Sequence, residues 1–287
     1  MSPRVQPFHH HASGTWTYIV DAGDGGGAAI IDPVLDFDPK SGRTGTTSAQ
    51  ALLEHVAAHR LAVQWILETH AHADHLSAGH WLKSQLPAAT LAIGAGIRAV
   101  QATFRDVFNL GAGFPADGSQ FDRLLAGGDT FAAGELHARA IAVPGHTSDC
   151  TAYLIGDALF PGDTLFMPDS GTARCDFPGG DAATLYRSIQ RLFALPAETR
   201  MFVCHDYGAS GREVACETSI GAQRRDNIHV RDGIDEAGFV AMRTARDATL
   251  PVPTLLFPAI QVNIRAGALP DPEANGVRYL KLPLDAL

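Results

Sequence analysis

Apolar and polar positions alternate in blocks along the first part of the chain, and these blocks predict strands joined by short turns. Residues 15–20 (TWTYIV) and 28–31 (AAII) are apolar runs, and the loop between them is rich in glycine, as a hairpin turn requires. The polar stretch 36–47 predicts a surface loop. Ser48 is the expected N-cap of a helix that runs to about residue 60.

Strand and helix patterns alternate further along the chain. Residues 63–68 (VQWILE) predict a buried strand, the spacing of leucines over 76–86 and the run 97–108 predict helices, and Asp181 begins a helix over 181–193. Further short strands are expected around 131 and at 91–93, 137–143, 151–155, 158–160 and 201–204. Strands followed by alternating strand and helix occur twice, which predicts an α/β fold: a sandwich of sheets flanked by helices, with loops converging on one edge.

The C-terminal part has a different pattern. We expect one domain over residues 1–287, with a core at about 15–210 and a helical extension and tail at about 211–287. Six prolines between 251 and 283 predict that the tail is irregular. No repeat or heptad pattern interrupts this organisation.

Composition and charge narrow the class of function. The 22 Lys and Arg against 31 Asp and Glu give a net charge of −9, which argues against nucleic acid and against an anionic membrane surface as partners. The four cysteines form no C-x-x-C pair, so we expect reduced thiols. Residues 1–5 lack the apolar core of a signal peptide, and we expect a cytoplasmic protein.

Four short segments, each just past an expected strand, carry the chemistry. The densest is His70-x-His72-x-Asp74-His75, directly after the strand 63–68. The other three are Pro144-Gly145-His146, Gly162-Asp163-Thr164 and Cys204-His205-Asp206-Tyr207. A divalent metal needs several nitrogen and oxygen donors that converge from a rigid base, and imidazole suits zinc and iron. Three histidines and an aspartate within six residues therefore predict a metal site, and the two oxygens of Asp163 could bridge two metals or serve one.

The remaining histidines lack such a pattern. We expect His9, His10 and His11 to be exposed near the N-terminus, and His55, His59, His80, His137 and His229 to have surface or packing roles.

The ordered set of donors resembles the pattern of the metallo-β-lactamase superfamily over most of residues 15–210. Within it, residues 68–78, 162–169, 171–179, 204–207 and 261–267 resemble the longer bacterial persulfide dioxygenases, which are related to glyoxalase II. The resemblance implies the αββα sandwich of the superfamily with a C-terminal helical extension and tail.

The same resemblance implies one Fe(II) per chain, held by His70, His146 and Asp163. Two histidines and one carboxylate form a facial triad that leaves coordination positions open for substrate and dioxygen. His72, Asp74, His75, His205 and Asp206 would then support these ligands or hold a second metal. The implied reaction is oxidation of glutathione persulfide by O₂ and water to sulfite and glutathione, and the implied assembly is a homodimer or higher homo-oligomer.

Glutathione carries two carboxylates, which arginine forks bind well. We expect Tyr207 and Arg224 as substrate contacts and Arg174 as local support in the same binding site. Two alternatives stay open. One is a dinuclear zinc thioester hydrolase of the glyoxalase II type, since the donors for two metals are present. The other is a non-catalytic persulfide sensor, although no DNA-binding module accompanies the site.

Overall fold

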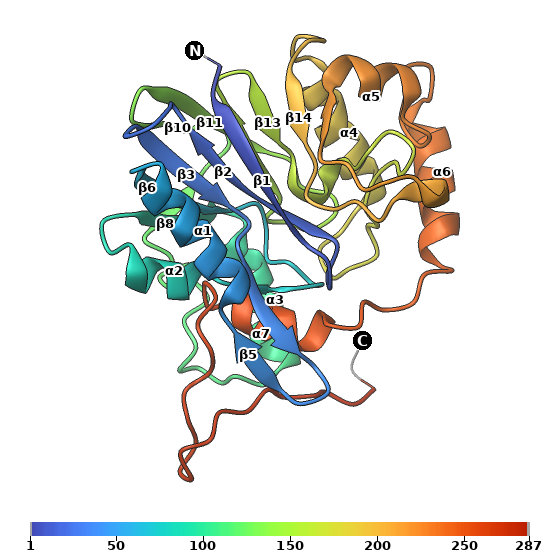
Figure 1. The fold of residues 1–287 in the computed structure, drawn as a ribbon. Helices are drawn as coiled ribbons and strands as arrows, with labels where there is room; N and C mark the ends of the chain where they lie inside the picture. The colour runs from blue at the N-terminus through green and yellow to red at the C-terminus, as the bar shows by residue number, and fades with distance from the viewer. Residues whose placement is uncertain (1, 286–287) are drawn as a thin grey trace.

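Two mixed β-sheets pack face to face at the centre of the molecule, and helices cover their outer faces (Figure 1). The computed structural model describes residues 2–285. The first sheet has the order β1-β2-β3-β6-β8-β9, with bounds β1 Arg4–His10, β2 Thr15–Asp21, β3 Gly27–Ile31, β6 Ala62–Glu68, β8 Thr90–Gly94 and β9 Arg123–Leu125. The second follows chain order: β10 Thr130–Ala133, β11 Leu136–Ala142, β12 Thr151–Ile155, β13 Ala158–Phe160, β14 Arg200–Phe202 and β15 Glu217–Ser219. A small third sheet joins β5 Arg43–Gly45, β4 Val34–Asp38 and β7 Leu76–Ser77.

Successive side chains of a strand point to opposite faces of its sheet, so the apolar side chains pack alternately between the two sheets and under the helices. In β2, Tyr18 and Val20 pack between the two sheets, whereas Ile19 packs under the helices of the first sheet. In β13, Phe160 points between the sheets and Leu159 toward the helices of the second. Both sheets are therefore buried on both faces, which explains why the central strands read as continuous apolar runs.

Two groups of helices complete the layers. On the first sheet lie α1 Thr47–Ala58, α2 Gly79–Gln85, α3 Ile97–Val107 and α7 Leu256–Asn263; on the second lie α4 Ala182–Phe193, α5 Ile220–Asp226 and α6 Glu236–Asp247. The side chain of Asp181 accepts a hydrogen bond from the Thr184 backbone N–H at 2.7 Å, so Asp181 is the N-cap of α4, as predicted. The predicted αββα sandwich is confirmed.

Several local expectations were wrong. The stretch 36–47 is not only loop, because it contributes to β4 and to all of β5. The helix α1 begins at Thr47 without a side-chain cap, so Ser48 is not the N-cap of this helix. The hydroxyl of Ser48 donates a hydrogen bond to the carboxylate of Asp36 instead. Residues 76–77 form strand β7 before α2 begins.

The N-terminal histidines and the C-terminal tail also differ from expectation. His9 and His10 are half-buried in β1, where the ring of His9 lies 4.4 Å from that of Trp16. The proline-rich tail contains α7, which begins after Pro253 and packs into the core with α1–α3. Among residues 2–285, no helix is both long and apolar enough to cross a bilayer.

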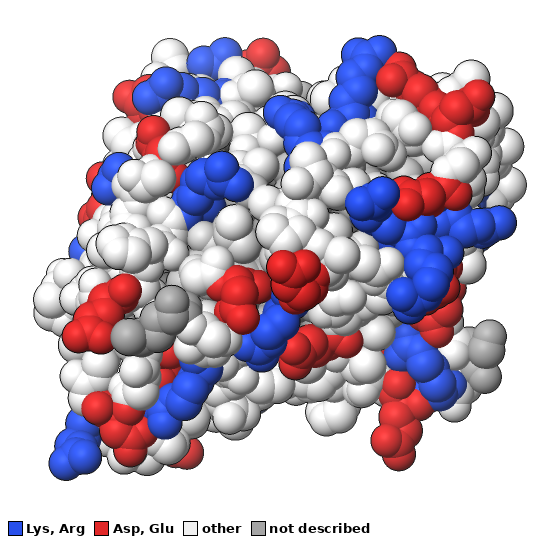
Figure 2. Space-filling model, turned by 90° about the horizontal axis from the view of Figure 1, so that it is seen from above, with Lys and Arg blue, Asp and Glu red and all other residues white. Residues whose placement is uncertain are grey.

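Basic side chains gather toward the side of the C-terminal helices on the face drawn in Figure 2, with acidic side chains next to them. Three ion pairs involve residues of α4, α5 and α6 and the turn after α5: Arg187 with Glu236 at 2.6 Å, Arg224 with Asp232 at 3.0 Å and Arg225 with Asp226 at 2.7 Å. These guanidinium groups are thus partly neutralised by their neighbours.

Candidate metal centre

The expected donors come together at one edge of the sandwich, where four strands end. The loop from His70 to His75 follows β6, and His146 follows β11. Asp163 lies in a short 3-10 turn after β13, and His205 follows β14. At Gly145, whose φ is +143°, a Cβ atom would lie 2.3 Å from the Leu185 backbone, so only glycine lets α4 approach the loop that carries His146.

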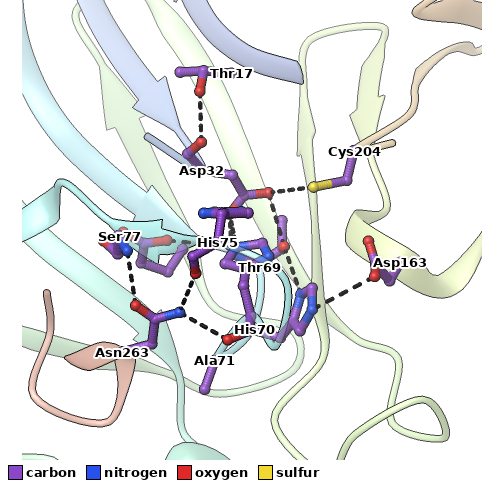
Figure 3. Close-up of polar contacts among 12 residues, drawn as sticks. Thr17, Asp32, Thr69, His70, Ala71, His75, Ser77, Asp163, Cys204 and Asn263 are labelled. Carbon is purple, nitrogen blue, oxygen red and sulfur yellow. Dashed lines mark hydrogen bonds and ion pairs between the residues drawn. The ribbon is translucent and has the colours of Figure 1, made fainter. Parts of the chain in front are cut away.

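One group of donors consists of His70, His146 and Asp163. The Nε2 atoms of His70 and His146 lie 3.8 and 3.7 Å from Oδ2 of Asp163. Figure 3 shows the His70 ring turned toward Asp163. All three side chains are buried, and one donor atom from each lies within 4.8 Å of the others. The structure therefore brings together the two imidazoles and the carboxylate expected to bind iron.

A second group of donors lies beside the first. It consists of His72, Asp74, His75 and His205, whose donor atoms also lie within 4.8 Å of one another. The Nε2 atom of His205 is 3.2 Å from Oδ2 of Asp74 and 3.3 Å from Oδ1 of Asp163. Asp163 thus turns one oxygen toward each group.

Outer hydrogen bonds fix the orientation of the imidazole rings. Nδ1 of His146 donates to the backbone oxygen of Arg174 at 2.7 Å, and Nδ1 of His75 donates to that of Leu76 at 3.2 Å. Nδ1 of His70 lies 3.1 Å from the hydroxyl of Thr69. In each ring the other nitrogen, Nε2, points into the centre, which is the arrangement found around protein-bound metals.

The inner atoms of the centre fit a metal. Among the described residues, Nε2 of His70, His75 and His205, together with Oδ1 of Asp163, are buried without a hydrogen-bond partner. Buried polar atoms are rarely left in this state unless an ion or water satisfies them. Burial lowers the pKa of His70 well below its usual value and that of His75 to about 3, so both rings are neutral and have a lone pair for a metal.

His72 is bound differently from the other histidines. Its Nε2 lies 3.0 Å from Oδ1 of Asp32 and 3.6 Å from Oε2 of Glu68. Burial disfavours a charged ring, but these two carboxylates outweigh it and raise the pKa of His72. Nδ1 is therefore the nitrogen of His72 that faces the second group.

The loop is also held by a residue that sequence reasoning did not single out. The side-chain amide of Asn263, at the end of α7, donates to the backbone oxygens of His72 and His75, both at 2.8 Å, and accepts from the Ser77 N–H at 2.8 Å (Figure 3). Asn263 belongs to the segment 261–267 on which the family resemblance partly rests, and this was its only signal in the sequence.

Comparison with known proteins identifies the family. The sequence matches the metallo-β-lactamase superfamily over residues 12–205, a range that holds both donor groups. The chain belongs to the metallo-β-lactamase superfamily. A solved superfamily structure, ETHE1 from Myxococcus xanthus, has a TM-score of 0.74 and 29% identity, covering 92% of this chain and all of that one.

Relatives within the superfamily have several names. A probable metallo-hydrolase of Burkholderia pseudomallei is 52% identical over 99% of both chains, and glyoxylase B2 of Dictyostelium discoideum is 49% identical over 90% of this chain and 89% of its own. Human persulfide dioxygenase ETHE1 is 28% identical over 88% of this chain and 84% of its own. The chain spans 66% of a β-lactamase hydrolase-like protein from Xylella fastidiosa, at 51% identity.

A cavity of about 260 Å³ opens onto the metal centre. Of the three residues expected near the substrate, Tyr207 and Arg174 line this cavity. The ring of Tyr207 is exposed at the cavity and lies parallel to that of His205. Arg174 also lines it, but its guanidinium binds Asp176 at 2.6 Å and lies over the ring of Phe177. The support that Arg174 gives His146 comes from its backbone oxygen.

Two predicted residues lie elsewhere. Arg224 is not among the cavity-lining residues and pairs with Asp232, so the structure does not bring it to the site. The carboxylate of Asp206 is buried, but it binds Arg212 and the Ala215 N–H at 2.7 Å rather than joining either donor group.

Two arginines on α6 line the cavity and were missed. Arg243 is buried and binds Asp247 at 2.6 Å and the Thr172 backbone oxygen at 3.1 Å. Arg246 is exposed and makes no ion pair within residues 2–285. Their position depends on how α6 folds back over the core, which no local pattern reveals.

Proposed function

We propose that this protein is a non-haem Fe(II) persulfide dioxygenase, which oxidises glutathione persulfide with O₂. Glutathione persulfide, O₂ and water would give glutathione, sulfite and two protons. The observation that carries the proposal is the donor group of His70, His146 and Asp163, two imidazoles and one carboxylate. This is the donor set of iron enzymes that react with dioxygen.

Iron would supply the redox chemistry with O₂ that zinc lacks. The neighbouring residues of the chain orient the side chains that would bind the iron. The hydroxyl of Thr69 and the backbone oxygen of Arg174 fix the rings of His70 and His146. The ring of Phe177 lies 5.4 Å from that of His146, and both rings line the cavity.

Substrate recognition is assigned to the cavity beside this group. Arg246 has a guanidinium free of carboxylate partners among the described residues, so it can pair with a carboxylate of glutathione. Tyr207 offers its hydroxyl on the same cavity. Arg246 thus takes the role that the sequence suggested for Arg224.

The test is metal analysis and oxygen uptake on protein purified without air. We expect about one iron per chain and rapid O₂ uptake on addition of glutathione persulfide. Two zincs per chain, no uptake and hydrolysis of S-lactoylglutathione would overturn the proposal.

Two arginine variants form a matched pair for the substrate site. Arg246→Ala should raise KM for glutathione persulfide by about tenfold, since a charged hydrogen bond contributes about 1.5 kcal/mol. Arg224→Ala should leave KM unchanged, because its partner is Asp232. The same KM for both variants would mean that Arg246 does not bind substrate.

One observation favours a second candidate, a dinuclear zinc thioester hydrolase. Asp74, His75 and His205, with Oδ1 of Asp163, offer the donors of a second metal. The name of the Dictyostelium relative, glyoxylase B2, points in the same direction. The metal count of the purified protein separates the two candidates.

A further inference from the structure

The backbone segment 172–175 carries the hydrogen-bond acceptor of His146 and belongs to no helix or strand. The backbone oxygen of Arg174 accepts from Nδ1 of His146 at 2.7 Å. Because the imidazole ring is rigid, the place of this oxygen sets the direction in which the other nitrogen, Nε2, points toward the metal centre. Whatever holds the segment therefore also orients the ligand.

Side chains rather than other backbone groups hold this segment. Within residues 2–285, the N–H and C=O groups of 172–175 form no hydrogen bond to another backbone group. The Thr172 oxygen accepts from Nη1 of Arg243 at 3.1 Å. The Cys175 N–H donates to Oδ2 of Asp247 at 2.8 Å. Two side chains of α6 thus bind the segment on both sides of the Arg174 oxygen.

Arg243 and Asp247 also bind each other, one helical turn apart on α6. Nη2 of Arg243 lies 2.6 Å from Oδ1 of Asp247, and the two residues are only 1% and 5% exposed. A buried ion pair gives little net stability over apolar side chains of similar size. Apolar side chains could not make the directional contacts to the segment, however, so the pair has a use that packing alone does not explain.

We infer that Arg243 and Asp247 are positioning residues for the metal ligand His146. The ion pair fixes the segment 172–175, and the Arg174 oxygen of that segment fixes the imidazole ring. This inference rests on the proposed function for the identity of the metal as iron. Loosening the pair should let the ring turn and weaken metal binding, although every ligand is still present.

Two acidic residues of α6 provide a matched test. Asp247→Asn and Glu236→Gln each replace a carboxylate of this helix with an amide of the same size. The amide at 247 has one oxygen and one NH₂ group, so it cannot accept from both Arg243 and the Cys175 N–H. Glu236 is the first residue of α6 and pairs with Arg187 at the surface, so its replacement leaves the segment untouched.

Asp247→Asn should lower the affinity for Fe(II) about tenfold, the lower end of the range for outer contacts of metal ligands. Competition with a chelator on anaerobic protein measures this. The visible absorption bands of the cobalt(II)-loaded protein, which depend on the geometry of the ligands, should shift as well. Arg243→Lys loses the planar fork that binds Asp247 and the Thr172 oxygen together, so it should behave in the same way. Glu236→Gln should match the parent in both measurements.

Circular dichroism establishes that each variant is folded. Affinity and cobalt spectrum like those of the parent in either folded variant of the buried pair would overturn the positioning role, and so would an equal loss in Glu236→Gln. Weaker binding with an unshifted cobalt spectrum would also overturn it, because the ring would not have moved. Weaker binding with a shifted spectrum, in a protein whose parent takes up no O₂ with glutathione persulfide, would keep the positioning role and overturn the dioxygenase.

Discussion

The two donor groups on either side of Asp163 differ in composition and in support. The group of His70 and His146 has two imidazoles and shares the carboxylate of Asp163. The second group has a carboxylate of its own, Asp74, and includes His72, whose Nε2 is bound by Asp32 and Glu68. A count of donors alone therefore fits two metals.

The outer contacts separate the groups further. His146 is oriented by the segment 172–175, which α6 of the C-terminal extension holds through Arg243 and Asp247. The loop from His72 to His75 is held by Asn263 at the end of α7. Both groups are thus supported by the C-terminal extension. Because α6 supports one group and α7 the other, each group can be perturbed separately.

The largest effect is expected at His146. Replacing it with alanine removes one of three donors of the first group, so His146→Ala should lose bound iron and turnover, as measured by elemental analysis and O₂ uptake. His137→Ala is the matched control, because His137 is an exposed histidine on β11, the strand that precedes His146. Retained iron and activity in His146→Ala would refute the ligand assignment.

Asn263→Ala should have the next largest effect. It leaves three backbone groups of the metal loop without their partner, so metal affinity should fall by ~10–100-fold, the range observed for outer contacts of metal ligands. Competition with a chelator measures this. Asn275→Ala, at an exposed asparagine bound to Tyr279, should leave affinity unchanged. If both variants bind metal equally well, Asn263 does not position the loop.

The first group could be predicted from the sequence because its residues lie next to strands that the apolar pattern shows. Each donor follows such a strand, so the sandwich alone brings the donors to one edge. The partners of these residues could not be predicted in the same way. Asn263 lies almost two hundred positions beyond His72, and only the packing of α7 against β7 brings them together.

The arginines show why substrate contacts are harder to predict from sequence than metal ligands. A sequence gives the position of an arginine along the chain but not the direction of its side chain. Arg224 points to Asp232 on the extension itself, whereas Arg246, one helix later, reaches the cavity. Arg174 is expected as local support for the site, and the contact that it makes with His146 comes from its backbone oxygen.

His75→Ala distinguishes the two groups most directly, although its effect is smaller. With a single iron on the first group, this variant should keep one iron per chain, and kcat should fall by about tenfold, the lower end of the range for residues that only support the ligands. Inductively coupled plasma analysis gives the metal count. A fall from two metals to one would establish a dinuclear centre in the parent and favour the zinc hydrolase.

The smallest effect is expected at His229, which supports the His146 side from a distance. Its Nδ1 accepts a hydrogen bond from the Thr172 N–H at 3.0 Å, and burial, aided by Arg243, lowers the pKa of His229 to about 4. In the unfolded chain this histidine has a pKa of about 6.5. The neutral ring therefore contributes fully to the free energy of unfolding above pH 6.5, and this contribution is lost as the pH falls toward 4. After allowance for solvent screening, the loss in the free energy of unfolding should be on the order of 2 kcal/mol.

The variant His229→Asn tests this expectation. It keeps an acceptor near Nδ1 but does not titrate, so its urea midpoint should fall less between pH 6.5 and 4 than that of the parent. Parallel pH profiles would show that protonation of His229 does not govern this part of the acid response.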